Sequence, residues 1–198
     1  MTNSAFNLEQ IKFEEKITDL LNLAELYLDF ALSYRKLFDD FYDNQDAIGQ
    51  QKILRHPITS NIILHSNSYL FLSINCLNTL LKSNDKAEVS FSKYFNKFGK
   101  LQNEIDEVRQ LYKDSLLDQV RDKIIAHKDL KNIGDPGGLA AILVHQKFFE
   151  STDIINTRLN NVVKDNFEEA HVNNPLLDLC ERGLKDTINY YKSILEDL

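Results

Sequence analysis

The sequence contains little of what a β-sheet protein needs. Its 198 residues include 6 Gly, 3 Pro and no Trp. Gly and Pro supply most of the tight turns that join β-strands, so their scarcity argues against a sheet architecture and favours helices. With only 6 Gly, the chain also has little scope for a Gly-rich phosphate-binding loop. The one Gly-rich segment, GDPGG at 134–138, lacks the Lys-Ser/Thr that such a loop requires.

Potential metal ligands are also few. Cys76 and Cys180 lie in apolar-patterned segments without ligand spacing, and we expect both to be buried, reduced thiols. No two of the five His stand at i,i+3 or i,i+4, and none belongs to a Glu-x-x-His pattern. We therefore expect neither a metal site nor a cofactor.

No hydrophobic run is long enough to cross a membrane. The most apolar segment, 69–81, is interrupted by polar residues and is shorter than the roughly 20 residues that a span needs. The first ten residues, MTNSAFNLEQ, lack the basic and apolar regions of a secretory signal. We expect a cytoplasmic protein without membrane contact.

Charge is divided unevenly along the chain, whose net charge is −7. Residues 1–50 carry 4 bases and 10 acids, and residues 165–198 carry 3 and 8, so residues 51–164 carry 16 bases and 12 acids. Local potential, rather than net charge, steers a polyanion. This basic middle is compatible with an RNA substrate, although ordinary scatter in charge would give the same difference.

Apolar residues recur at steps of three and four, as on amphipathic helices. Residues 6–48 predict one long helix or two consecutive ones closed by Gly49, and Arg55-His56-Pro57 predicts a break. Thr59 or Ser60 is expected to cap the next helix, which runs to about Leu81. Further helices are predicted over 91–98 between Ser90 and Gly99, over about 101–127, over 151–167 and over about 175–195.

Residues 130–138 predict a loop, and residues 139–149 fit either a helix or a strand. The whole pattern predicts a single all-α domain over residues 1–198, built as a bundle of four to five main helices.

The segment Arg121-Asp122-Lys123-Ile124-Ile125-Ala126-His127 bears most directly on function. An Arg can hold a phosphate and a His can move a proton near neutral pH, which is the minimum for metal-free RNA cleavage. Residues six apart on a helix differ by about 240° in azimuth, so Arg121 and His127 would not share a face. They can cooperate if the helix loosens at His127, or if a second copy of the chain supplies the complementary group.

A structural role for both residues is the alternative. Arg121 could pair with Asp114 or Asp118 on its own helix, and His127 could bind the last carbonyl groups of that helix. With six Arg and five His in the chain, the bare spacing would occur by chance roughly 0.5 times, so its context carries the weight. That context is a predicted helix end, the polar Asp122 and the loop that follows.

RDKIIAHKD, from Arg121 to Asp129, resembles the signature of the HEPN superfamily, in which an Arg and a polar residue precede a His at the end of a bundle helix. The preceding EVRQLYKDSLLDQVRDKIIAH and the upstream YRKLFDDFY resemble the abortive-infection branch, so the likeness covers about residues 20–130. It implies a helical bundle that forms a two-fold dimer. It also implies a metal-independent endoribonuclease, often a toxin or phage-defence effector, whose two motif copies meet at the dimer interface.

The resemblance also implies residue roles. Arg121 would bind the scissile phosphate, His127 would act as general acid/base, and Asp122 would orient one of them. The RNA itself would be contacted by Lys123, Lys128 and Lys131. Some members carry, two residues after the His, a Tyr that a nucleotidyltransferase antitoxin modifies. Asp129 stands there in this chain, so an antitoxin or nucleotidyltransferase-type partner would act differently.

Two non-catalytic roles remain open. The chain could be a HEPN-like module that binds RNA or a nucleotide for a partner, or a helical interaction module in which Arg121 only makes salt bridges. A second cluster consists of aromatic residues among lysines, which could stack bases or pack between helices: Lys93, Tyr94, Phe95, Lys97, Phe98 and Lys100. We expect packing there, and likewise for His65 in its apolar segment.

Overall fold

The computed structural model describes residues 2–82, 87–115, 117, 146–167 and 175–197. Every regular element within these ranges is an α-helix, which confirms the predicted all-α class. The described helices are α1 (Thr2–Asp43), α2 (Ala47–Arg55), α3 (Pro57–Leu81), α4 (Phe91–Phe98), α5 (Gln102–Asp114), α8 (Gln146–Asn166) and α9 (Pro175–Glu196). None of them combines the length and the apolar character that a membrane crossing requires.

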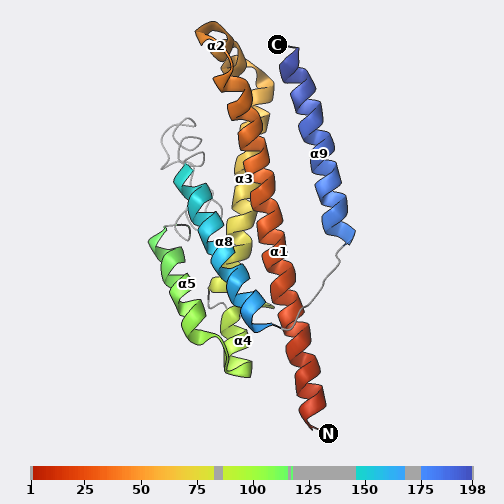
Figure 1. Cartoon of the computed structure of the whole chain (residues 1–198), viewed down its shortest axis with the longest axis vertical. Helices are drawn as coiled ribbons and strands as arrows, with labels where there is room; N and C mark the ends of the chain where they lie inside the picture. The colour runs from red at the N-terminus through yellow and green to blue at the C-terminus, as the bar shows by residue number, and fades with distance from the viewer. Residues whose placement is uncertain (1, 83–86, 116, 118–145, 168–174, 198) are drawn as a thin grey trace.

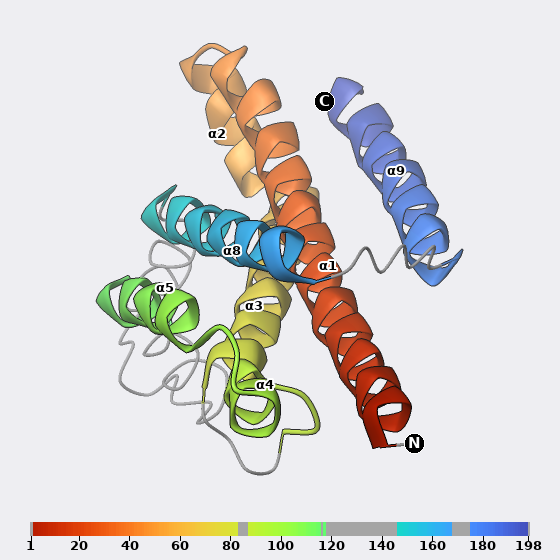
Figure 2. The same cartoon turned by 60° about the horizontal axis from the view of Figure 1, so that its bottom comes forward.

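α1 is a single helix of 42 residues, and it forms the long axis of the molecule. α3 runs beside it, and the two helices share the most extensive contact among the described elements. In both views, α5 and α8 lie on one side of α1 and α9 lies on the other (Figures 1 and 2). The C-terminal end of α9 lies at the α2 end of the molecule, opposite the N-terminus (Figure 1).

Small residues spaced seven apart bring α1 and α3 together. Ala24 and Ala31 on α1 are fully buried. The Ser73 hydroxyl on α3 donates to the Ala24 carbonyl oxygen at 2.7 Å, and the Ser66 hydroxyl donates to the Ala31 carbonyl oxygen at 2.8 Å. The later Ser meets the earlier Ala, so the helices are antiparallel. The small Ala side chains let the backbones of α1 and α3 approach each other, and these bonds satisfy the Ser hydroxyls that are buried there.

Two apolar clusters surround this pair of helices. The larger cluster joins α1 and α3 to α4, α5 and α8, and the smaller joins the second half of α1 and the start of α3 to α9. In the smaller cluster the Tyr34 ring lies edge-on to the Tyr191 ring at 6.0 Å and stacks on the His65 ring at 5.3 Å. His65 therefore packs among aromatic rings, as expected.

Several predicted helix ends are confirmed. α4 occupies 91–98: the Ser90 hydroxyl accepts from the Lys93 amide at 3.3 Å, and Gly99 adopts a φ of 70° that its missing Cβ permits. α2 ends at Arg55, and α3 begins at Pro57. α8 contains most of the helix predicted over 151–167, and α9 begins and ends close to the predicted 175–195.

Two predicted helix-end residues differ in the structure. α1 already ends at Asp43, and Gly49 lies inside α2, where its amide donates to the Asp46 carboxylate at 2.8 Å. The Asp46 cap starts a new helix before Gly49 can end the old one. α3 is capped by the His56 ring, whose Nδ1 accepts from the Ile58 amide at 3.3 Å, rather than by Thr59 or Ser60.

The helix predicted over 101–127 is shorter where the structure describes it. α5 ends at Asp114, and the Ser115 hydroxyl donates to the Tyr112 carbonyl oxygen at 2.7 Å. A Ser hydroxyl bonded to a nearby carbonyl oxygen offers the backbone an alternative to helix continuation. The remainder of that predicted helix after Leu117, the predicted loop at 130–138 and residues 139–145 lie outside the described residues.

The two cysteines have different environments. Cys76 is buried as predicted, and burial raises the pKa of its thiol to about 11. Cys180 is exposed, so the prediction that it is buried is wrong. α9 contributes Tyr191 and Leu195 to the buried core from its C-terminal part, whereas Cys180 lies near its N-terminal end. Cys180 continues the apolar pattern of α9 beyond the contact that α9 makes.

Enlarging the α1–α3 contact should destabilise the protein. We expect Ala24→Leu to lower the free energy of unfolding by about 1–3 kcal/mol, because the added side chain must push two packed backbones apart. Urea unfolding followed by circular dichroism measures the difference. The matched control is Ala47→Leu at an exposed position of α2, and equal unfolding midpoints for the two variants would contradict the role given to this contact.

Candidate functional site

The predicted catalytic residues lie outside the described part of the chain. This holds for Arg121, Asp122 and His127, and for the proposed RNA contacts Lys123, Lys128 and Lys131. The pairing of Arg121 with Asp114 or Asp118 is likewise not described. Their roles remain predictions, and the described residues bear on them through the elements at either end of the segment.

Both ends of residues 118–145 are joined to the larger apolar cluster. Leu117, four residues before Arg121, is fully buried, and Phe149 on α8 is also buried; both belong to that cluster. α5 and α8 pack against each other, and Figure 1 shows them side by side. The described residues on either side of the motif segment are therefore part of the same packed core.

Arg109 fixes the position of α5. Its Nε donates to the Leu81 carbonyl oxygen at 2.8 Å, its Nη1 donates to the Asp106 carboxylate at 2.8 Å, and its Nη2 donates to the Ser92 hydroxyl. The guanidinium therefore ties α5 to the end of α3 and to α4. These bonds use three of its five donors, which gives Arg109 a structural role in holding the helix that precedes the motif.

Two aromatic residues of the cluster on α4, Tyr94 and Phe98, pack in the core as expected, whereas Lys97 and Lys100 are exposed. Tyr94 is 1% exposed, and its ring lies 5.0 Å from that of Phe98 and 5.3 Å from that of Phe167. Lys93 donates to the Ala87 carbonyl oxygen, and Lys97 forms an ion pair with Glu9. These aromatic rings pack between helices and offer no stacking platform for bases.

Tyr94 also completes a polar group inside the core. Glu14 on α1 is only 5% exposed, and its Oε1 accepts from the Tyr94 hydroxyl and, at 2.7 Å, from the Gln10 amide. Burial first, and the bond to Glu14 second, raise the pKa of Tyr94, so its phenol remains a donor. This contact could not be predicted from sequence patterns, because Glu14 and Tyr94 are 80 residues apart.

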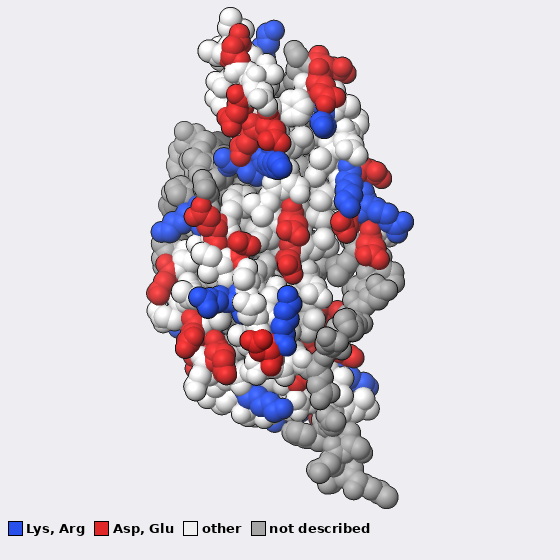
Figure 3. All heavy atoms as spheres, in the orientation of Figure 1, with Lys and Arg blue, Asp and Glu red and all other residues white. Residues whose placement is uncertain are grey.

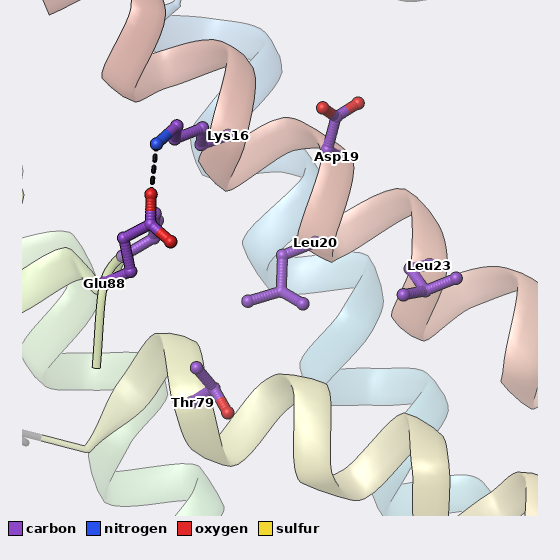
Figure 4. A pocket seen from close by; sticks show the side chains of 7 residues that line it. Lys16, Asp19, Leu20, Leu23, Thr79 and Glu88 are labelled. Carbon is purple, nitrogen blue, oxygen red and sulfur yellow. Dashed lines mark hydrogen bonds and ion pairs between the residues drawn. The ribbon is translucent and has the colours of Figure 1, made fainter. Parts of the chain in front are cut away.

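A groove lies between α1, α3 and the segment before α4 (Figure 4). Its volume is about 430 Å³, and its described lining is Lys16, Asp19, Leu20, Leu23, Thr79, Glu88 and Val89. In Figure 4 Leu20 points from α1 into the space toward Thr79, and the Lys16 amino group points at the Glu88 carboxylate across one end. The hydrogen bond and charge of Lys16 lower the pKa of Glu88.

The lining of this groove is suited to binding an apolar group and not to catalysis. Leucine and valine side chains form much of its described lining, and an ion pair closes one end. A general acid/base works best with a pKa near the operating pH. The lowered pKa of Glu88 moves it away from that range, and the described lining contains no His or Cys. We assign no catalytic role to the groove.

Charge is mixed over the visible surface. On the face in Figure 3, Lys and Arg side chains alternate with Asp and Glu rather than forming one basic area. Several charged side chains of the described residues are paired along single helices, such as Arg35 with Asp39 and Lys185 with Glu181. Among the described residues, no group of three or more His, Cys, Asp or Glu side chains is arranged to hold a metal ion.

The chain was also compared with known proteins. No family model, no curated protein and no solved structure matches it.

The Glu14–Tyr94 contact should be essential for stability. We expect Tyr94→Phe to lower the free energy of unfolding by about 1–3 kcal/mol, because a buried carboxylate loses one of its donors. Chemical denaturation measures the effect. Tyr190→Phe, which removes a hydroxyl from a residue that is 62% exposed, should leave stability within about 0.5 kcal/mol; equal losses in the two variants would refute the contact's role.

Proposed function

We propose that this chain is a metal-independent endoribonuclease of the HEPN type that acts as a toxin or phage-defence effector. The observation that carries the proposal is the segment RDKIIAHKD, which places Arg121, Asp122 and His127 within seven consecutive residues. The site is composite: two copies of the chain form a homodimer, and the motifs of both copies meet in one cleft.

The described fold supports this proposal in two ways. Every regular element among the described residues is an α-helix, which is the class of fold that the HEPN resemblance implies. In the sequence the motif also follows soon after α5, which Arg109 holds in place, and after Leu117, which is buried in the larger apolar cluster. A catalytic group must be held to within a fraction of an ångström, and anchored elements provide such a base better than isolated loops.

The proposed reaction needs no metal ion to generate its nucleophile. A His127 imidazole accepts the proton of the ribose 2′-OH, and the 2′ oxygen attacks the neighbouring phosphorus. The bond from phosphorus to the 5′ oxygen breaks, and the same imidazole, now protonated, returns its proton to that oxygen. Arg121 stabilises the charge that develops on the phosphate. The products are a 2′,3′-cyclic phosphate and a 5′-hydroxyl, so the reaction is restricted to RNA.

Two of the described lysines already have partners within the protein, which bears on the choice of lysines proposed to bind RNA. Lys93 and Lys97 are engaged by Ala87 and Glu9. We therefore propose that phosphates are bound by the basic residues of the motif segment: Lys123, Lys128 and Lys131. An antitoxin or nucleotidyltransferase-type partner would have to act without the Tyr that Asp129 replaces.

Removal of the imidazole should stop the reaction. We expect His127→Ala to reduce RNA cleavage by about 10²–10⁴-fold, because proton transfer to and from the reacting oxygens is lost. Two assays measure the effect: cleavage of a set of labelled RNAs, each with one 2′-deoxy nucleotide at a different position, and growth inhibition when the protein is expressed. His171→Ala provides a matched control that removes another His, and it should leave both readouts unchanged.

Three outcomes separate the alternatives. Undiminished cleavage by His127→Ala would contradict the catalytic role. RNA binding without turnover in the wild-type protein would instead favour a non-catalytic HEPN-like binding module. Loss of cleavage in EDTA would point to a metal-dependent reaction, whereas the proposed mechanism predicts full activity. Circular dichroism of each variant establishes that the helices are retained.

A further inference from the structure

α3 and its cap carry no formal charge. Residues 56–81 contain no Asp, Glu, Lys or Arg, although 27% of the chain is charged. A helix enclosed on all sides would explain this composition, but α3 is not enclosed. Seven of its residues are exposed: Pro57, Ser60, Asn61, Leu64, Ser68, Leu72 and Asn75.

Other helices of the same protein behave differently at their exposed positions. α1 exposes eleven side chains among residues 8–43, and nine of them are charged: Glu9, Lys12, Glu15, Lys16, Glu25, Asp29, Lys36, Asp40 and Asp43. On α3 the corresponding number is zero of seven. Absence of charge together with exposed large apolar side chains, here Leu64 at 62% and Leu72 at 42%, is typical of the centre of a protein interface.

Five of the seven exposed residues of α3 also form a symmetric sequence. Leu64 and Leu72 stand four residues on either side of Ser68, and Asn61 and Asn75 stand seven residues on either side. Helix geometry makes these five positions a single stripe, because steps of three and four return to the same face. Geometry does not require that symmetric positions carry identical residues, yet here they do.

We propose that this stripe, defined as Asn61, Leu64, Ser68, Leu72 and Asn75, is the contact between two copies of the chain. The copies pack antiparallel about a two-fold axis at Ser68. Leu64 then meets Leu72 of the partner subunit, Asn61 meets the partner's Asn75, and the two Ser68 side chains face each other. Spacings of four and seven are those of knobs-into-holes packing between helices.

Chemistry favours a second copy as the occupant. Asn and Ser side chains both donate and accept hydrogen bonds, so each Asn can bond to an Asn of an identical stripe. The chain has a net charge of −7, so two copies repel each other over most of their surfaces. The stripe itself carries no charge, so it adds nothing to that repulsion. Ser68 also allows close approach of two helices, as Ser66 and Ser73 do against α1.

The size of the stripe indicates a reversible dimer. Asn61 and Asn75 are about 21 Å apart along the helix axis, and neighbouring half-buried residues such as His65 and Phe71 widen the contact. One helix face of this length buries less than the roughly 800 Å² per partner of a standard interface. We therefore expect association at micromolar concentration. The inference is independent of RNA cleavage, and it names the surface through which the proposed nuclease would acquire its second copy.

Cysteine cross-linking tests the geometry. In a Cys180→Ser background, which removes the exposed thiol, Ser68→Cys places the two new thiols at the two-fold axis, and oxidation should yield a covalent dimer on denaturing gels. Asn61→Cys is the matched control on the same stripe. Its two copies would lie about 21 Å apart, far beyond the roughly 7 Å limit between bridged Cα atoms, and should not cross-link. Mixing Asn61→Cys with Asn75→Cys protein should restore cross-linking.

Mass in solution tests the dimer itself. Light scattering between about 1 and 200 μM, a range that brackets micromolar affinity, should show the 23.0 kDa chain approaching twice its mass. Leu64→Arg should abolish this increase, because an arginine would be buried against Leu72 of the partner subunit. Ile154→Arg, at a 52% exposed residue of α8, should leave it intact. A wild-type monomer throughout this range, a dimer that survives Leu64→Arg, or a failure of Ser68→Cys to cross-link would overturn the proposal, whatever the nuclease assays show.

Discussion

The close antiparallel contact between α1 and α3 is the constraint on which the rest of the described fold depends. Ala24 and Ala31 remove side-chain bulk from one helix, and Ser73 and Ser66 place hydroxyls against their carbonyl oxygens. The pair then presents one side to α5 and α8 and another to α9. Because α1, α8 and α9 leave one side of α3 exposed, the same packing that builds the core also creates the stripe centred on Ser68.

Local features were predictable from the sequence, because local interactions decide them. Ser90 and Gly99 bound α4 through bonds within one turn, and Pro57 and Pro175 begin helices because they fix φ and lack an amide hydrogen. Features that depend on distant partners were not. Cys180 continues the apolar pattern of α9 but lies beyond the contact that α9 makes, and the Glu14–Tyr94 bond joins residues that the sequence keeps far apart.

For the candidate site, too, some features could be predicted from the sequence and others only from the fold. A motif of seven consecutive residues is visible in the sequence, and chemical reasoning assigns Arg121 and His127 complementary roles. Other basic residues considered for RNA binding or catalysis have structural partners: Lys97 pairs with Glu9, and His65 packs on Tyr34. Periodicity predicts that α3 is a helix but does not give the exposure of its faces. Only the fold shows that one of its faces is exposed, and this exposure turns an uncharged sequence into a candidate interface.

The central claim is that Arg121 and His127 act across a two-fold dimer. It is tested most directly by a mixed dimer in which one subunit carries Arg121→Ala and the other carries His127→Ala, each with a different affinity tag. Neither variant should cleave RNA as a homodimer. The mixed dimer retains one Arg121 and one His127 on different subunits, so we predict cleavage well above that of both homodimers, ending in a 2′,3′-cyclic phosphate. A purified mixed dimer that is as inactive as its parents would contradict the account.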